Sequence, residues 1–298
     1  MNFPCNWRQY AGALASLVFL IFAPAASASL LNVSDPSFDD NGPGNYAYPT
    51  SSSFGLGAFD IHQFQVFDDG TTIYFLLTIR NLTPTFGNAL GAQLIDVYLH
   101  DPNAAAASTT TSAAFPGRNY QIAAADAWSR LVEVQGFGQR YVDASGETLG
   151  TIAISVSAAT NTVMFSVPAG TLGHPGPGWD AVAVLTGQDG FSPDLARSFT
   201  STPSAFTFGV CAVASADPHC TANPASVPKV MDTIAPTGSA QSTELDYTLH
   251  SPVVLFGVPF PEGGTMGAPP GIVPEPSTLA LLLLGVLGVR VVRFYKRM

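Results

Sequence analysis

The side chains best suited to chemistry in this sequence are acidic and amide groups near its N-terminal end. Asp35, Asp39, Asp40 and Asn41 bring four oxygen-bearing side chains into one short segment. The turn 42–44 follows, and its glycines at both ends let backbone carbonyls approach the same point. Calcium binds through several hard oxygen ligands of this kind. The segment therefore predicts a calcium site, with calcium as the expected cofactor.

The same acidic residues have a simpler interpretation. Their spacing differs from that of an EF-hand loop, and Asp and Asn at such positions also form Asx turns that face water. Both interpretations stay open. Asp60 and Asp96 lie on expected strands, where an unpaired buried carboxylate is costly, so we expect hydrogen-bonded structural or supporting roles for these two.

Four aromatic side chains are candidates for carbohydrate binding. Pyranose rings stack on aromatic faces, while their hydroxyl groups need hydrogen-bonding neighbours. Tyr46 and Tyr48 stand in a loop rich in Gly and Pro, where exposure is expected. Trp128 and Trp179 flank strand-like runs, which favours a core role for both. The sequence alone does not place any of the four on a binding face.

Two cysteines predict a disulfide bond. Cys5 belongs to an N-terminal segment that we expect to be removed, which leaves Cys211 and Cys220 as an even pair. A metal site formed by this pair with His219 is the alternative, but no second ligand cluster accompanies it.

Catalytic motifs are missing from the sequence. It contains no Gly-x-Ser-x-Gly elbow, no phosphate-binding loop and no His-Glu-x-x-His motif, and its five histidines are scattered. We therefore expect no catalytic residue and no enzymatic activity. A pair of glycosidase carboxylates remains the alternative, because such a pair is defined in space and not by sequence spacing.

Alternation of apolar and polar residues predicts β-strands. The segments 59–67 and 72–79 form one expected hairpin around the turn 68–70, and 152–156 with 163–167 form another. Five further strands are expected at 94–99, 131–134, 181–185, 206–210 and 253–256.

Many short strands with Gly and Pro in the turns predict an all-β protein, an antiparallel β-sandwich of the jelly-roll type. We expect this domain to cover residues 29–258. The Ala-, Ser- and Thr-rich tract 104–114 is expected to be a surface insertion. The Pro- and Gly-rich segment 259–272 is expected to be a flexible linker.

The two ends of the chain have the features of targeting segments. Arg8 precedes the apolar stretch 11–22, and Ala26-Ser27-Ala28 supplies small residues for cleavage, so residues 1–28 predict a signal peptide. A retained N-terminal anchor is the alternative. The segment 273–298 combines Pro274-Glu275-Pro276 with an apolar run and four terminal cations.

This C-terminal segment resembles the PEP-CTERM sorting signal of exopolysaccharide-producing Gram-negative bacteria. The resemblance implies export to the cell envelope and processing by a peptidase of the exosortase type. The apolar residues 279–292 predict a single membrane helix of about 21 Å, which is short against a hydrocarbon core of roughly 30 Å. The cations after it would keep the C-terminus cytoplasmic. A buried core helix is the alternative.

The charge of the exported part excludes a class of partners. The chain has 298 residues, with 11 basic and 21 acidic side chains. Removing both end segments takes away five cations and Glu275, which leaves 6 basic and 20 acidic residues and a net charge of -14. Nucleic acid is excluded as a partner, because its phosphates require clustered Lys and Arg. An acidic surface suits solubility outside the cell and the binding of divalent cations.

A second resemblance covers most of the exported part, about residues 31–258. Its motifs, in chain order, are 35–50, 59–61, 94–98, 117–119, Trp128, Trp179, 187–191, Arg197, 208–209 and 231–232. Together they resemble the C-terminal domain of glucodextranase and of some amylopullulanases. That family is similar to DOMON domains and family 9 carbohydrate-binding modules, which implies a non-catalytic β-sandwich associated with polysaccharide or the cell surface.

Two functions follow from these expectations. One is an envelope-anchored module that binds exopolysaccharide or another cell-surface glycan; the other is a structural surface or matrix protein without a sugar site. The resemblance to DOMON domains also raises haem on Met164 or Met231 with a histidine, although no motif singles these residues out.

Overall fold

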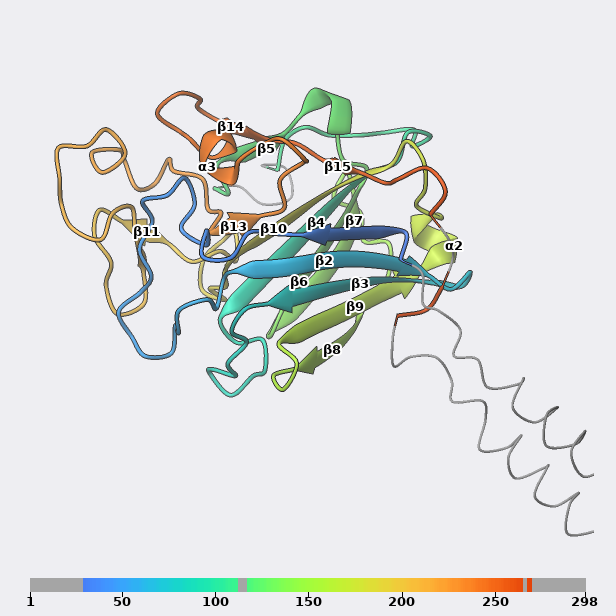
Figure 1. Cartoon of the computed structure of the whole chain (residues 1–298), viewed down its shortest axis with the longest axis horizontal. Helices are drawn as coiled ribbons and strands as arrows, with labels where there is room; N and C mark the ends of the chain where they lie inside the picture. The colour runs from blue at the N-terminus through green and yellow to red at the C-terminus, as the bar shows by residue number, and fades with distance from the viewer. Residues whose placement is uncertain (1–28, 112–116, 265–266, 270–298) are drawn as a thin grey trace, which may run out of the picture.

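The computed structural model describes residues 29–111, 117–264 and 267–269 (Figure 1). The expected signal peptide 1–28 and the sorting segment 273–298, with its apolar run, lie outside these residues. Within the described ranges, no helix is long and apolar enough to cross a membrane.

One layer of the fold is a five-stranded sheet in the order β1-β2-β3-β9-β8. Its strands are β1 (Leu31–Ser34), β2 (Ile61–Asp68), β3 (Thr72–Ile79), β9 (Thr162–Pro168) and β8 (Ala153–Ser157). All neighbours are antiparallel, and both expected hairpins are present. Buried and half-buried residues alternate along β3, as expected for a strand with one face in the core.

The other layer is a six-stranded sheet in the order β13-β10-β4-β6-β7, with β15 beside β10. Its strands are β13 (Asp232–Thr233), β10 (Asp180–Gly187), β4 (Gln93–His100), β6 (Arg130–Gln135), β7 (Gly138–Asp143) and β15 (Val258–Pro259). Figure 1 shows this sheet behind the first one. Aliphatic side chains of both sheets fill the space between them, where the rings of Phe75 and Phe165 stack with centroids 5.3 Å apart.

The second sheet is covered on its outer face as well. Strand β5 (Tyr120–Ile122) pairs in parallel with β14 (Val253–Leu255), and both pack with Trp128 on the outward side chains of β4, β6 and β10. All residues of β4 except His100 are therefore buried. The antiparallel all-β sandwich predicted from the sequence is confirmed.

Short elements complete the fold. They are β11 (Phe199–Thr200) paired in parallel with β12 (Phe208–Gly209), the helices α2 (Ala169–Leu172) and α3 (Gln241–Glu244), and a 3-10 turn at Ala124–Asp126. The strand expected at 206–210 is thus shorter than predicted.

Described residues of the expected linker and of the expected surface insertion make contacts with the sandwich. In the segment 259–272, Phe260 is buried and its N–H donates to the carbonyl of Trp179 at 2.8 Å, and the N–H of Gly267 donates to Asp68 at 2.7 Å. In the tract 104–114, Ser108 forms a bridge with Trp128 and Thr111 is buried. Residues 104–110 are exposed or partly exposed, as expected for a surface insertion, whereas Phe260 and Gly267 are held by contacts that a flexible linker would lack.

A long loop, residues 35–48, leaves β1 and crosses to the other sheet. The N–H of Gly42 donates to the carbonyl of Met231 at 2.9 Å, and Ala47 forms a bridge with Gly209. Figure 1 shows this loop in blue beside β13 and β11. The loop therefore joins the two sheets at one end of the sandwich, where the candidate site lies.

Candidate functional site

Three carboxylates meet where the loop 35–48 crosses the sandwich, and a fourth lies beside them. One carboxylate oxygen from each of Asp35, Asp39 and Asp232 lies within 4.8 Å of the other two. Asp60, the residue before β2, is fully buried, and its Oδ2 accepts a hydrogen bond from the N–H of Phe38 at 2.9 Å. We call Asp35, Asp39, Asp60 and Asp232 the acidic cluster.

The acidic cluster is poorly compensated. Asp232 accepts hydrogen bonds from the N–H groups of Ile61 at 2.5 Å and Thr233 at 2.8 Å. In contrast, one enclosed oxygen of each of the other three carboxylates has no hydrogen-bond partner in the described part of the chain. The ion pair seen there joins Asp60 to Arg80, with 3.5 Å between the carboxylate and the guanidinium, and Arg80 is partly exposed. Buried charges of one sign therefore outnumber their partners.

The protonation of the acidic cluster reflects this imbalance. Burial raises the pKa of Asp35 to about 8, and the charges of Asp39 and Asp60 add to the effect. Burial, followed by the charge of Asp35, also raises the pKa of Asp232 well above its usual value. Such carboxylates must hold protons or a cation when they are buried together.

The structure rearranges the set of calcium ligands that the sequence predicted. It brings Asp35 and Asp39 together but turns Asp40 toward the hydroxyl of Tyr48, with which it is hydrogen-bonded. The carbonyl of Asn41 accepts the N–H groups of residues 44 and 46, which closes the turn. Asp232 lies with Asp35 and Asp39 instead, and the buried Asp60 lies beside them. Sequence reasoning missed Asp232 because it stands almost two hundred residues away from the loop.

A hollow that we call the aromatic pocket borders the same loop and has a volume of about 360 Å³. Its apolar lining comes from Phe38, Tyr46, Tyr48 and Leu56, and its polar lining comes from Asp40, Asn41 and Arg80. The Phe38 side chain is 67% exposed, and the Arg80 guanidinium lies 3.2 Å from its ring centroid. Exposed ring surface and hydrogen-bonding groups therefore occur side by side.

The four aromatic candidates from the sequence separate into two pairs. Tyr46 and Tyr48 both line the aromatic pocket, although the Tyr46 ring is largely buried and its hydroxyl donates to the carbonyl of Pro228 at 2.9 Å. Trp128 and Trp179 are buried in the two apolar cores. Neither indole offers a face on which a sugar could stack, so the core role that the sequence favoured for them is the one observed.

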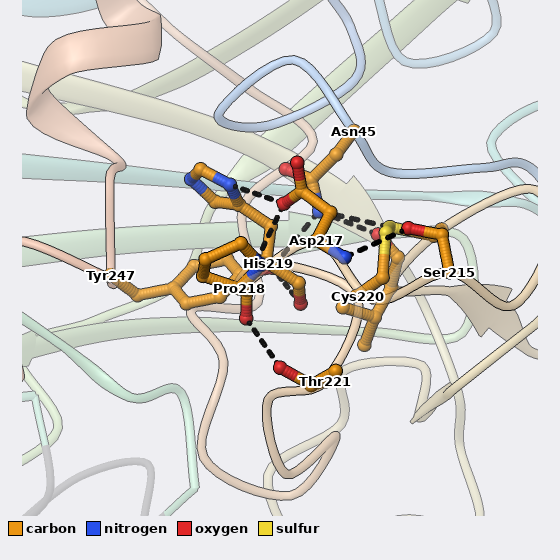
Figure 2. The surroundings of a disulfide bond; sticks show 10 residues. Asn45, Ser215, Asp217, Pro218, His219, Cys220, Thr221 and Tyr247 are labelled. Carbon is orange, nitrogen blue, oxygen red and sulfur yellow. Dashed lines mark hydrogen bonds and ion pairs between the residues drawn. A yellow bond between two sulfur atoms is a disulfide. The ribbon is translucent and has the colours of Figure 1, made fainter.

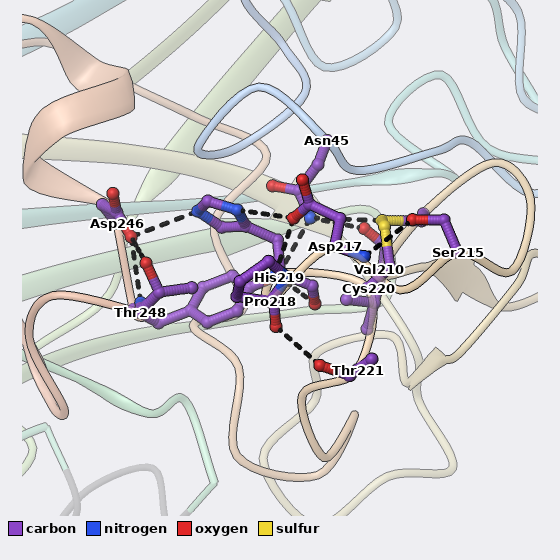
Figure 3. A network of polar contacts seen from close by, with 12 residues as sticks. Asn45, Val210, Ser215, Asp217, Pro218, His219, Cys220, Thr221, Asp246 and Thr248 are labelled. Atoms are coloured by element: carbon purple, nitrogen blue, oxygen red, sulfur yellow. Dashed lines mark hydrogen bonds and ion pairs between the residues drawn. A yellow bond between two sulfur atoms is a disulfide. The ribbon is translucent and has the colours of Figure 1, made fainter.

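The predicted disulfide between Cys211 and Cys220 is present (Figure 2). Both sulfur atoms are therefore unavailable as metal thiolates, which corrects the alternative of a metal site with His219. The His219 ring instead lies between two carboxylates, with Nδ1 3.0 Å from Asp217 and Nε2 3.1 Å from Asp246 (Figure 3). Asn45 links this region to the loop 35–48 by donating to the carbonyl of Val210 at 2.6 Å.

A second group of buried charges lies on the outer face of the six-stranded sheet. The Arg118 guanidinium, with no exposed surface, pairs with Asp96 and with Glu133, the latter at 2.9 Å. The hydroxyls of Tyr98 and Tyr120 also donate to Asp96. Asp96 therefore has the hydrogen-bonded structural role expected of it. Because both carboxylates are closed off from solvent, this pair cannot reach a glycosidic bond.

The fold and the pocket together describe a β-sandwich with a hollow on its surface. Residues 30–254 match the model of the C-terminal binding module, SLH-like, of glucodextranase, and the chain belongs to this family. Residues 273–297 match the PEP-CTERM protein-sorting motif. The comparison with curated proteins gave no match. The protein is therefore a member of a binding-module family. Its own chain also carries a signal for export and association with the cell envelope.

Proposed function

We propose that this protein binds carbohydrate at the cell surface through the aromatic pocket and has no enzymatic activity. Its family supports a binding role, and its sorting motif supports a place at the envelope, where exopolysaccharide is the available polymer. The observation that carries the proposal is the aromatic pocket, which combines exposed ring surface with a carboxylate, an amide and a guanidinium.

The pocket has the chemistry that a neutral sugar requires. The Phe38 and Tyr48 rings supply apolar surface for pyranose C–H groups, and Asp40, Asn41 and Arg80 supply acceptors and donors for hydroxyls. Its volume lies in the range of small-molecule sites, which suits one or two sugar units. The net charge of -14 on the exported part disfavours polyanionic glycans. A neutral glucan or exopolysaccharide is the proposed partner.

Affinity electrophoresis and a glycan array with the exported protein test this proposal, with the organism's own exopolysaccharide among the glycans. Phe38→Asn removes the exposed ring, and Asn tolerates the positive φ of 74° at this position, so backbone strain does not confuse the result. Phe137→Ala is the matched control, because Phe137 is 57% exposed and lies outside the pocket lining. We expect Phe38→Asn to reduce retardation at least tenfold and the control to leave it unchanged. Absence of retardation on every glycan would favour a structural matrix protein instead.

The sorting motif leads to a second part of the proposal. A peptidase of the exosortase type cleaves near Pro274-Glu275-Pro276, after the C-terminal apolar run has held the protein in the membrane. Mass spectrometry of the surface form should then find a C-terminus close to this motif. A surface form that still ends at Met298 would contradict processing and leave the segment as a permanent anchor.

A further inference from the structure

The loop 35–48 contributes to both the acidic cluster and the aromatic pocket. Asp39 belongs to the acidic cluster, and the next residue, Asp40, lines the aromatic pocket. Phe38 presents its ring to the pocket while its N–H donates to Asp60 at 2.9 Å. Whatever fixes the acidic cluster therefore also fixes the position of the pocket lining.

The acidic cluster has the features of a site that lacks its positive partner. Asp60 is fully buried, its Oδ1 has no hydrogen-bond partner in the described part of the chain, and its charge acts on the other three carboxylates. An enclosed oxygen of Asp35 and one of Asp39 are likewise unpartnered there. Leaving buried carboxylate oxygens unpaired is costly, so the arrangement points to a bound cation.

We propose that Asp35, Asp39 and Asp232 bind one calcium ion beside the buried carboxylate of Asp60, and that this ion holds the loop 35–48 in the conformation that forms the aromatic pocket. Hard carboxylate ligands without His or Cys suit calcium and disfavour zinc. A hollow of about 340 Å³, lined by Asp35, Asp39 and Gly42 among others, gives the ion a path from solvent and room for water ligands. The effect on the pocket rests on the proposed function; the cation site does not.

The position of the three ligands explains the coupling. Asp35 follows β1 of the first sheet, Asp232 belongs to β13 of the second sheet, and Asp39 lies in the loop between them. One ion bound by all of them ties both sheets to the loop. Without it, repulsion between carboxylates and their need for protons act against the same arrangement.

Calorimetric titration and thermal melting of the exported protein test the cation site. Calcium should bind with a saturable heat and raise the melting temperature, and magnesium at matched ionic strength should do so less, because it fits a large oxygen site poorly. Asp232→Asn should abolish both effects. Asp35→Asn provides the same test if the first variant does not fold. Glu262→Gln, which removes one exposed negative charge, should keep them. Equal responses in Asp35→Asn and Glu262→Gln would overturn the site.

The coupling is tested by affinity electrophoresis of the same proteins in calcium and in chelator. We expect chelation, or Asp35→Asn, to weaken glycan retardation at least several-fold. Retardation that is identical in calcium and chelator would overturn the coupling and leave the proposed function standing. Calcium binding without retardation on any glycan would overturn the coupling together with the proposed function, but not the cation site.

Discussion

Two groups of buried carboxylates in this protein differ in where their positive charge comes from. On the outer face of the six-stranded sheet, Asp96 and Glu133 share the fully buried Arg118. At the end of the sandwich, the acidic cluster has the partly exposed Arg80 beside one of its four members. The first group contains its own buried cation, although one oxygen of each of its carboxylates also has no hydrogen-bond partner in the described part of the chain. The second has no buried cation of its own among the described residues, and it is the group for which we propose a cation from solvent.

The largest effect is expected when the buried guanidinium of Arg118 is removed. Arg118→Met leaves Asp96 and Glu133 buried without the buried guanidinium that they share, which should cost about 3 to 5 kcal/mol in the free energy of unfolding. Urea unfolding in calcium and in chelator measures this loss, which should be the same in both. Arg140→Met is the control, because Arg140 is 40% exposed and lies 3.8 Å from Glu133. An equal loss in the two variants would show that burial of Arg118 is not what matters.

The internal network should also give a pH dependence. Burial, followed by the charge of Asp96, raises the pKa of Glu133 to about 7 from its usual 4.5, against the opposing effect of Arg118. The folded protein then holds a proton that the unfolded chain has lost, so the contribution of Glu133 to stability is greatest below about pH 4.5 and is lost as pH rises through 7. Unfolding of the protein and of Glu133→Gln across this range, in saturating calcium, should show a smaller decrease for the variant. Identical slopes would mean that Glu133 is ionised throughout.

Local sequence patterns predict some of these features, whereas others depend on contacts between distant segments. Local alternation is enough to predict the hairpin of β2 and β3, and the Asp-rich loop signals that oxygen ligands gather there. The contribution of Asp232 depends on how β13 joins the second sheet, which no local pattern encodes. The burial of both faces of β4 likewise depends on the parallel pair β5 and β14 that covers its outer face. Contacts between distant segments therefore decide which predicted residues form a site.

A smaller effect, with a change of sign, is expected in the acidic cluster. Asp35→Asn removes a carboxylate whose pKa is raised by burial, so in chelator the variant should be more stable than the parent by on the order of 1 kcal/mol. In saturating calcium the variant should instead be the less stable protein, because it has lost a ligand. Thermal melting in both conditions measures the two differences. If the stability difference between variant and parent had the same sign in calcium and in chelator, the acidic cluster would need no external cation, like the Arg118 network.

The smallest effect is expected for charges that solvent reaches. His219 lies between Asp217 and Asp246 beside the disulfide, and the exposed fractions of the His219 and Asp246 side chains are 27% and 19%. Ion pairs that face water contribute little, so Asp246→Asn should lower the free energy of unfolding by less than about 1 kcal/mol, and by still less at high salt. Replacing both Cys211 and Cys220 by Ser should cost about 2 to 3 kcal/mol, since the bond closes a short loop. Urea unfolding of both variants at two salt concentrations compares them. If Asp246→Asn cost as much as the loss of the disulfide, the ion pairs around His219 would hold this loop, and exposure would no longer separate weak charge pairs from strong ones in this protein.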